Sequence, residues 1–212
     1  MLRIVLYLCC LFLSTAHAQD KAADTQLKVL LSEIKSFSSP FTQQVYNGQE
    51  LLQEAQGTLT LQRPQRLFWH VTAPDETQLI TKGEEVYLID PFLEQVSIFS
   101  LAQMLPNNPL LLLLNDDQHT WDEFSITLSK LGDALTFAVV PKASNAQITQ
   151  LSLTFATGRL LGMTFTDAQN QRSELVFLAP TINATVASDV FDIEIPDGYS
   201  IDDQRAIPAT AF

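Results

Sequence analysis

The stretch GTLTLQRPQRLFWHVTAPDETQLITKGEEVYLIDPFLEQV, residues 57 to 96, decides the fold. Apolar residues alternate in it with other side chains: Leu59 and Leu61 form one run, and Leu67, Trp69 and Val71 form the next. Further apolar runs lie at 79–80, 86–89 and 96–98, and turn residues separate all of them at 63–65, 73–75, 82–83 and 90–91. This period of two between turn signals predicts an antiparallel meander of short strands.

The same pattern continues on both sides of this stretch. Residues 41–46 and 52–62 predict a strand pair, because Asn47-Gly48 is a hairpin signal. Later strands are predicted at 123–128, 134–140, 148–155, 160–166 and 172–178. Residues 180–190 show no usable periodicity, and an irregular tail follows. Together these segments predict about 11 strands in one antiparallel sheet. A sheet of this size must curve strongly or close into a barrel.

One helix precedes the sheet, over residues 20–35. Its apolar side chains Leu27, Leu30, Leu31 and Ile34 recur at i, i+3, i+4 and i+7 and form one stripe. We expect residues 38–40 to end it, because Pro40 cannot continue a helix. The fold class is therefore mainly β with few helices (α+β), a strongly curved sheet that wraps its concave face around the helices.

A helical insertion is predicted at the five consecutive leucines, residues 110–114. Asn108 has the character of an N-cap, and Pro109 suits the first helical position. Two interpretations are open. The segment is a core helix buried on every side, or it packs one face on the core and turns the other toward a cavity.

The first 18 residues have the pattern of a cleaved signal peptide. Arg3 precedes an apolar run over residues 4–13, and Ala16-His17-Ala18 is a small-x-small cleavage site before Gln19. The run is too short to cross about 30 Å of hydrocarbon as an anchor. Residues 19–212 then predict a single domain. Both cysteines lie within the signal, so the exported domain relies on packing and not on disulfides.

Composition favours a binding function over a catalytic one. The net charge of −12 disfavours nucleic acid and anionic lipid as partners. After the signal only His70 and His119 remain among histidines, so we expect no metal site and no cofactor. The chain has no G-x-S-x-G elbow and no Gly-rich phosphate loop, although a Ser-His-Asp triad meets only in space and stays an open alternative.

Large apolar side chains are in surplus on the predicted concave face. Each has two interpretations, as ordinary core or as the lining of a groove for acyl chains, whose burial contributes about 0.8 kcal/mol per methylene. The candidate lining residues are Leu59, Leu61, Leu67, Trp69, Val71, Leu79, Leu110, Leu113 and Met163.

Arg63 is the exception on this apolar face. It shares strand parity with Leu59 and Leu61, so its side chain is predicted to point the same way. One interpretation is an edge arginine that extends to water next to Pro64. The other is a role in holding the helices, because five donors in a rigid fork suit the unpartnered carbonyls of helix C-termini.

Several motifs resemble the LolA family of periplasmic outer-membrane lipoprotein carriers. They are RP at 63–64, LFWH at 67–70, PDE at 74–76, DPFLEQ at 90–95 and PKASN at 141–145, and the similarity extends to DDQR at 202–205. The resemblance implies an incomplete barrel whose helices form a lid over an apolar cavity. It also implies that Arg63 bonds backbone carbonyls of the lid and holds it shut. Arg66 departs from the family pattern, in which an uncharged residue is expected.

The resemblance further implies a non-enzymatic carrier in the periplasm. Such a monomer takes acylated lipoproteins from an inner-membrane lipoprotein-releasing ABC transporter, shields their acyl chains and passes them to an outer-membrane receptor. Two alternatives come from other classes: a periplasmic sensor or regulator that binds lipid or lipoprotein on a related fold, and a lipid-modifying hydrolase.

Overall fold

The computed structural model describes residues 14–105, 108–114 and 118–205. Residues 1–13 of the predicted signal peptide, and the side chain of His119, lie outside the described residues. The described helices are α1 (Ser14–Glu33), α2 (Leu101–Met104), α3 (Pro109–Leu112) and α4 (Gln118–Asp122), with a 3-10 turn η2 at Ser188–Phe191. None of these helices is both long and apolar enough to cross a membrane.

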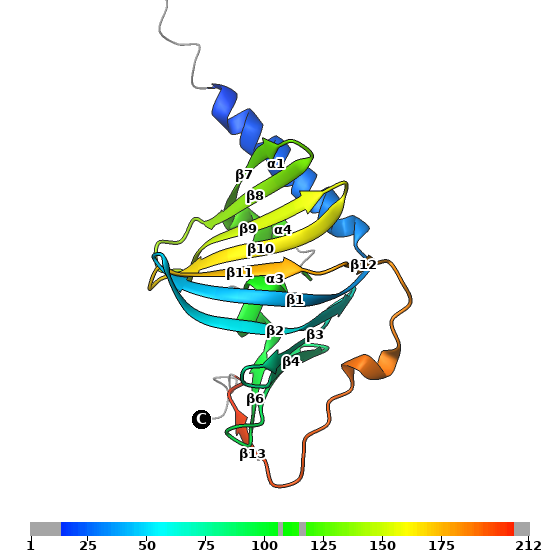
Figure 1. Cartoon of the computed structure of the whole chain (residues 1–212). Helices are drawn as coiled ribbons and strands as arrows, with labels where there is room; N and C mark the ends of the chain where they lie inside the picture. Colours follow the sequence, from blue (N-terminus) through cyan, green and yellow to red (C-terminus); the bar gives the residue numbers. More distant parts are fainter. Residues whose placement is uncertain (1–13, 106–107, 115–117, 206–212) are drawn as a thin grey trace, which may run out of the picture.

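One sheet of 13 strands dominates the described chain (Figure 1), in the order β13-β6-β5-β4-β3-β2-β1-β11-β10-β9-β8-β7, with β12 paired to β1. The strands are β1 (Ser36–Asn47), β2 (Glu50–Gln62), β3 (Arg66–Ala73), β4 (Thr77–Lys82), β5 (Glu85–Asp90), β6 (Gln95–Ser100), β7 (Phe124–Leu131), β8 (Ala134–Pro141), β9 (Ile148–Ala156), β10 (Arg159–Asp167), β11 (Gln171–Phe177), β12 (Thr181–Ile182) and β13 (Ser200–Asp203).

The predicted meander is confirmed as strands β2 to β6, each antiparallel to the next. Its register brings the predicted apolar residues side by side: Leu59 lies opposite Trp69, and Trp69 lies opposite Leu79. The alternation seen in the sequence therefore places one set of side chains on one face of three neighbouring strands.

Two strands were missed, and one pairing differs from the expected antiparallel pattern. β12 and β13 are only two and four residues long, too short for a period of two to show. β13 pairs with β6 in parallel, and the amide of Ser200 donates to the carbonyl of Glu94 at 2.8 Å. A parallel partner so far along the chain leaves no local turn signal.

The first helix begins at Ser14, six residues before the predicted start, and ends at Glu33, two residues before the predicted end, and Pro40 lies inside β1. The side chain of Asn183 explains the early end. Its Oδ1 accepts from the amide of Lys35 at 2.7 Å, and its Nδ2 donates to the carbonyl of Glu33 at 2.9 Å. A residue from the other end of the chain thus takes over the hydrogen bonds that another helical turn would have made.

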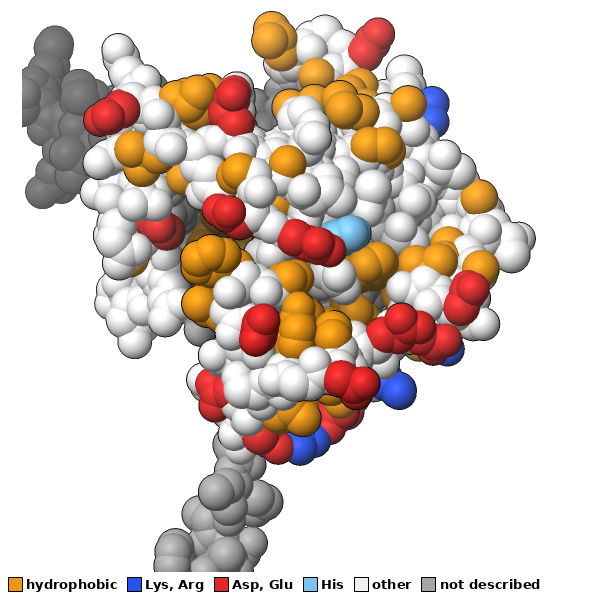
Figure 2. All heavy atoms as spheres, turned by 60° about the horizontal axis from the view of Figure 1, so that its bottom comes forward, with side chains coloured by type: hydrophobic (Ala, Val, Ile, Leu, Met, Phe, Trp, Pro, Cys, Tyr) orange, Lys and Arg blue, Asp and Glu red, His pale blue; other side chains and the backbone are white. Residues whose placement is uncertain are grey.

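The core lies between the sheet and the helices. Figure 1 shows the sheet curving around α3 and α4, while α1 packs against β7. Leu27, Leu31 and Ile34 of the predicted stripe are buried in the main apolar cluster, and Leu30 packs against it half-buried. The face shown in Figure 2 is acidic: Asp and Glu side chains are more abundant on it than Lys and Arg, with apolar groups between them.

Candidate functional site

The leucine segment, residues 110–114, is enclosed by the rest of the protein. Its five side chains are between 0 and 5% exposed. Asn108 caps the helix as predicted, because its Oδ1 accepts from the amides of Leu110 at 3.0 Å and Leu111 at 3.4 Å. The α-helix itself ends at Leu112, so Leu113 and Leu114 follow it. In this state the segment is buried on every side, as the first interpretation of the sequence expected.

Arg63 lies directly after β2, and its side chain bonds the chain segment after α1 and the segment after α3. Its Nε donates to the carbonyl of Ile34 at 3.0 Å, Nη1 donates to Leu114 at 2.8 Å, and Nη2 donates to Leu113 at 2.6 Å. Ile34 follows the end of α1, and the two leucines follow α3, so all three acceptors are carbonyls at helix ends. We call this set of bonds the Arg63 clamp. The half-buried guanidinium ties the ends of both helices to the sheet.

The predicted lining residues gather in one cluster beneath these helices. Eight of the nine are buried in the main core, and Trp69 packs against it half-buried. The strands β2, β3, β4 and β10 and the leucine segment supply them: Leu59, Leu61, Leu67, Trp69, Val71, Leu79, Leu110, Leu113 and Met163. The clamp therefore holds helices over the apolar surface that the sequence singled out.

A cleft of about 510 Å³ opens beside this covered core. Its apolar lining comes from Leu101 and Leu105 of the α2 segment and from Phe124 at the start of β7. Gln65, two residues beyond the arginine of the clamp, also lines it, and so does Glu84. An apolar opening next to the clamp is where a chain-like apolar ligand could begin to enter.

Comparison with known proteins places this architecture in a family. The family model for the outer membrane lipoprotein carrier protein LolA matches residues 32–194. The chain belongs to the LolA family. An outer-membrane lipoprotein carrier protein of Pseudomonas paraeruginosa is 35% identical over 189 residues, which is 89% of this chain and 91% of the relative. That of Pseudomonas fluorescens is 34% identical over 202 residues, 95% of this chain and 98% of the relative.

Solved structures agree on the fold. An uncharacterized conserved protein from Thermus thermophilus superposes with a TM-score of 0.52 at 9% identity, covering 84% of this chain and 99% of that one. At this identity the likeness concerns the fold alone. The curved sheet with few helices is thus shared with a protein of very different sequence.

Arg66, the departure from the LolA pattern, lies away from the clamp. Its guanidinium sits over the ring of Phe191 in η2, 5.9 Å from the ring centroid. Phe191 is buried, and η2 packs against β3 and β4. The extra charge therefore holds the C-terminal segment against the sheet by a cation–π contact.

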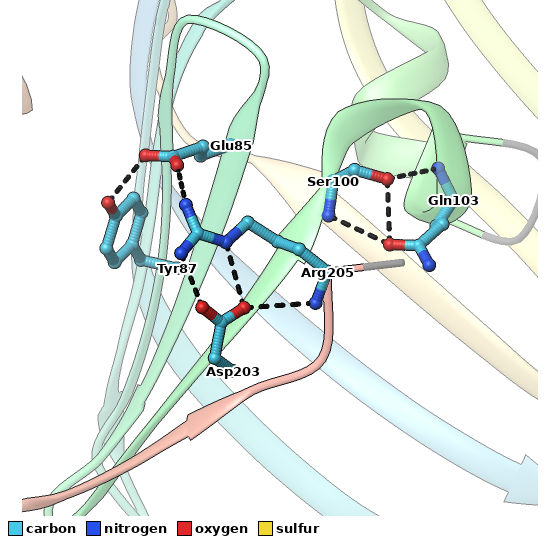
Figure 3. Close-up of polar contacts among 6 residues, drawn as sticks. All are labelled: Glu85, Tyr87, Ser100, Gln103, Asp203 and Arg205. Carbon is cyan, nitrogen blue, oxygen red and sulfur yellow. Dashed lines mark hydrogen bonds and ion pairs between the residues drawn. The ribbon is translucent and has the colours of Figure 1, made fainter. Parts of the chain in front are cut away.

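A polar cluster missed by the sequence analysis fastens the last strand of this LolA-family chain (Figure 3). Arg205 forms ion pairs with Asp203 and Glu85, and Glu85 also accepts from the hydroxyl of Tyr87 at 2.7 Å. The side-chain and backbone hydrogen bonds from Arg205 lower the pKa of Asp203 to about 2. The hydrogen bond from Tyr87, and then Arg205, lower the pKa of Glu85. Arg205 and Glu85 are 120 residues apart, so no local spacing indicates that the pair Asp203–Arg205 meets the pair Glu85–Tyr87.

Metal-ligating side chains do not gather into a metal site in the part of the chain that the structure describes. No group of three or more His, Cys, Asp or Glu side chains there could hold a metal. His70 faces outward on β3 and its Nε2 lies 2.8 Å from Oε1 of Glu76, whose pKa this hydrogen bond lowers. An exposed pair of this kind fits a surface contact.

Proposed function

We propose that this LolA-family chain is a non-enzymatic periplasmic carrier that shields the acyl chains of lipoproteins. Residues 1–18 direct export and are removed, and residues 19–212 form the single carrier domain. The domain, a monomer without cofactor, receives its cargo from an inner-membrane lipoprotein-releasing ABC transporter and gives it to an outer-membrane receptor. The observation that carries the proposal is the Arg63 clamp over a cluster of large apolar side chains.

The energetics of the clamp suit reversible loading. Opening the helices breaks hydrogen bonds to a charged group, a net cost of roughly 1.5–3 kcal/mol. An acyl chain that replaces the leucine segment against the sheet contributes about 0.8 kcal/mol per buried methylene. About two to four methylenes therefore offset the clamp, and the rest of the chain offsets the burial that the displaced leucines lose. The empty protein closes again by remaking the clamp, which favours release to a receptor that binds more tightly.

The test is ligand binding without turnover. An environment-sensitive apolar dye is added to residues 19–212, followed by a diacylated peptide or the same peptide without acyl chains. We expect the acylated peptide alone to displace the dye, with its ester bonds intact afterwards. Release of free fatty acid that a single substitution abolishes would identify a hydrolase and overturn the proposal. N-terminal sequencing of the exported chain should begin at Gln19.

A further inference from the structure

Trp69 holds a hydrogen-bond donor that the closed structure does not use. Its indole Nε1 is buried, and no acceptor among the described residues bonds it. Tryptophan N–H groups normally find a partner when buried, because an unpaired buried donor is costly. Such a donor within a binding face is a candidate contact for a ligand acceptor.

The ring of Phe41 does not satisfy this donor. Phe41 and Trp69 lie nearly parallel, with an interplanar angle of 21° and centroids 5.8 Å apart. An indole N–H points outward in the plane of its own ring, so a stacked neighbour does not present its π-face to that hydrogen. The stack instead fixes the plane of the indole.

Close packing of the neighbouring strands fixes the position of the indole. Gly57 lies opposite Phe41 on β1, and a Cβ there would stand 2.9 Å from Phe41 Cζ and 2.0 Å from the carbonyl oxygen of His70. Only glycine leaves room for this close approach of β1, β2 and β3. The donor therefore has a set direction before any ligand arrives.

Trp69 also lies at the right depth for the head of an acyl chain. Its strand neighbours Leu59 and Leu79 are fully buried, whereas Trp69 is half-buried at the margin of the same cluster. In an acylated cargo the ester carbonyls join the apolar chains to the polar remainder. Because the donor atom itself is buried while other atoms of the indole reach the margin, an ester carbonyl just inside the margin of the opened cluster can meet it while the chains lie deeper.

We propose that the indole N–H of Trp69 donates a hydrogen bond to an acyl-ester carbonyl of the cargo. This inference rests on the proposed carrier function and names a polar contact within it. It makes the carrier sensitive to how the chains are attached, and not only to their length.

The test compares two ligands and two proteins. One ligand is a diacylated peptide with ester links, and the other is its diether analogue with the same chain lengths. Trp69→Phe keeps a flat apolar ring and removes the donor. We expect the variant to lose about 3- to 10-fold in affinity for the ester ligand and to bind the ether ligand as the wild type does, the effect of one neutral hydrogen bond.

Trp121→Phe is the matched control. It makes the same chemical change at the other tryptophan, which is buried in α4. Its ratio of ester to ether affinity should equal that of the wild type. An unchanged ratio in Trp69→Phe would overturn the inference, whereas a wild-type protein that binds neither ligand would overturn the carrier function instead.

A measurement on the wild type avoids any effect of the variant on folding. In ¹⁵N-labelled protein the indole N–H resonance of Trp69 should move downfield with the ester ligand and not with the ether ligand. The resonance is assigned by its loss in Trp69→Phe or its persistence in Trp121→Phe. Equal shifts with both bound ligands would show that the carbonyl is not the acceptor.

Discussion

Replacing Arg63 by leucine tests the clamp directly. The change removes three side-chain hydrogen bonds, at 3.0, 2.8 and 2.6 Å, to the carbonyls of Ile34, Leu114 and Leu113. It also adds an apolar side chain beside the covered cluster. Both changes favour the open, loaded state, because water can hydrate the freed carbonyls only when the helices move away.

The magnitude follows from the geometry. Hydrogen bonds to a charged group contribute about 1.5–3 kcal/mol each, but the guanidinium is half-buried and the three bonds act together. We therefore take about 1.5–3 kcal/mol for the whole clamp. Since 1.36 kcal/mol is a factor of ten, Arg63→Leu should shift the ratio of closed to open protein roughly 10- to 150-fold.

The assay separates loading from delivery. Carrier loaded with a labelled lipoprotein is mixed with membranes that hold the receptor, and the label left on the carrier is followed over time. We expect Arg63→Leu to load normally and to retain its cargo. Arg63→Lys should be intermediate, because one ammonium group cannot bond three carbonyls in a fork.

A neighbouring arginine supplies the control. Arg66→Leu also replaces an arginine by leucine, but the guanidinium of Arg66 lies over the ring of Phe191, and we expect this variant to leave delivery unchanged. If Arg63→Leu instead loads poorly and delivers normally, the side chain acts in receiving cargo and the clamp reasoning is wrong.

Three further predictions concern the stability of the fold. Leu111→Ala removes a side chain with 0% exposure and should lower the free energy of unfolding by about 2–5 kcal/mol in urea titration; a loss below 1 kcal/mol would mean that the segment is not packed as described. Gly57→Ala should lower the melting temperature, because its methyl group would meet the carbonyl of His70; an unchanged melting temperature would contradict this close approach. The pKa of Asp203 lies below its ordinary 3.8, so its contribution is full above pH 3.8 and is lost as the pH falls through about 2. The protection of the β13 amides from exchange, relative to unstructured amides at the same pH, should therefore fall over that range in the wild type, and a fall that persists in Arg205→Gln would point to another group.

Local pattern predicted the sheet and the side of it on which Arg63 lies. Parity from Leu59 and Leu61 placed Arg63 on the covered face, and the structure shows its donors at that face. Successive side chains of a strand point to opposite faces of the sheet, so the face of a residue can be predicted from its position without knowledge of tertiary contacts. The role of Arg63 in the function remains a proposal.

Long-range contacts set what local pattern could not predict. The end of α1 depends on Asn183, and the fastening of β13 depends on Arg205 meeting Glu85. The leucine segment was ambiguous for a related reason: five identical apolar residues have no polar face, so the sequence does not tell which side is covered. The unused donor of Trp69 likewise depends on what lies around it in space.

The short strand β13 has a consequence for the behaviour of the protein in solution. An open sheet ends in two strands with unpaired backbone groups, and such edges are templates along which neighbouring chains add. At one end α1 packs against β7. At the other end β13 covers β6, whose sequence QVSIFS contains no charged residue and no proline that would disfavour pairing. The edge strand is then β13, which carries Asp202 and Asp203. The four residues of β13 thus disfavour polymerisation. This matters in a protein that, as we propose, exposes apolar surface whenever it takes up cargo.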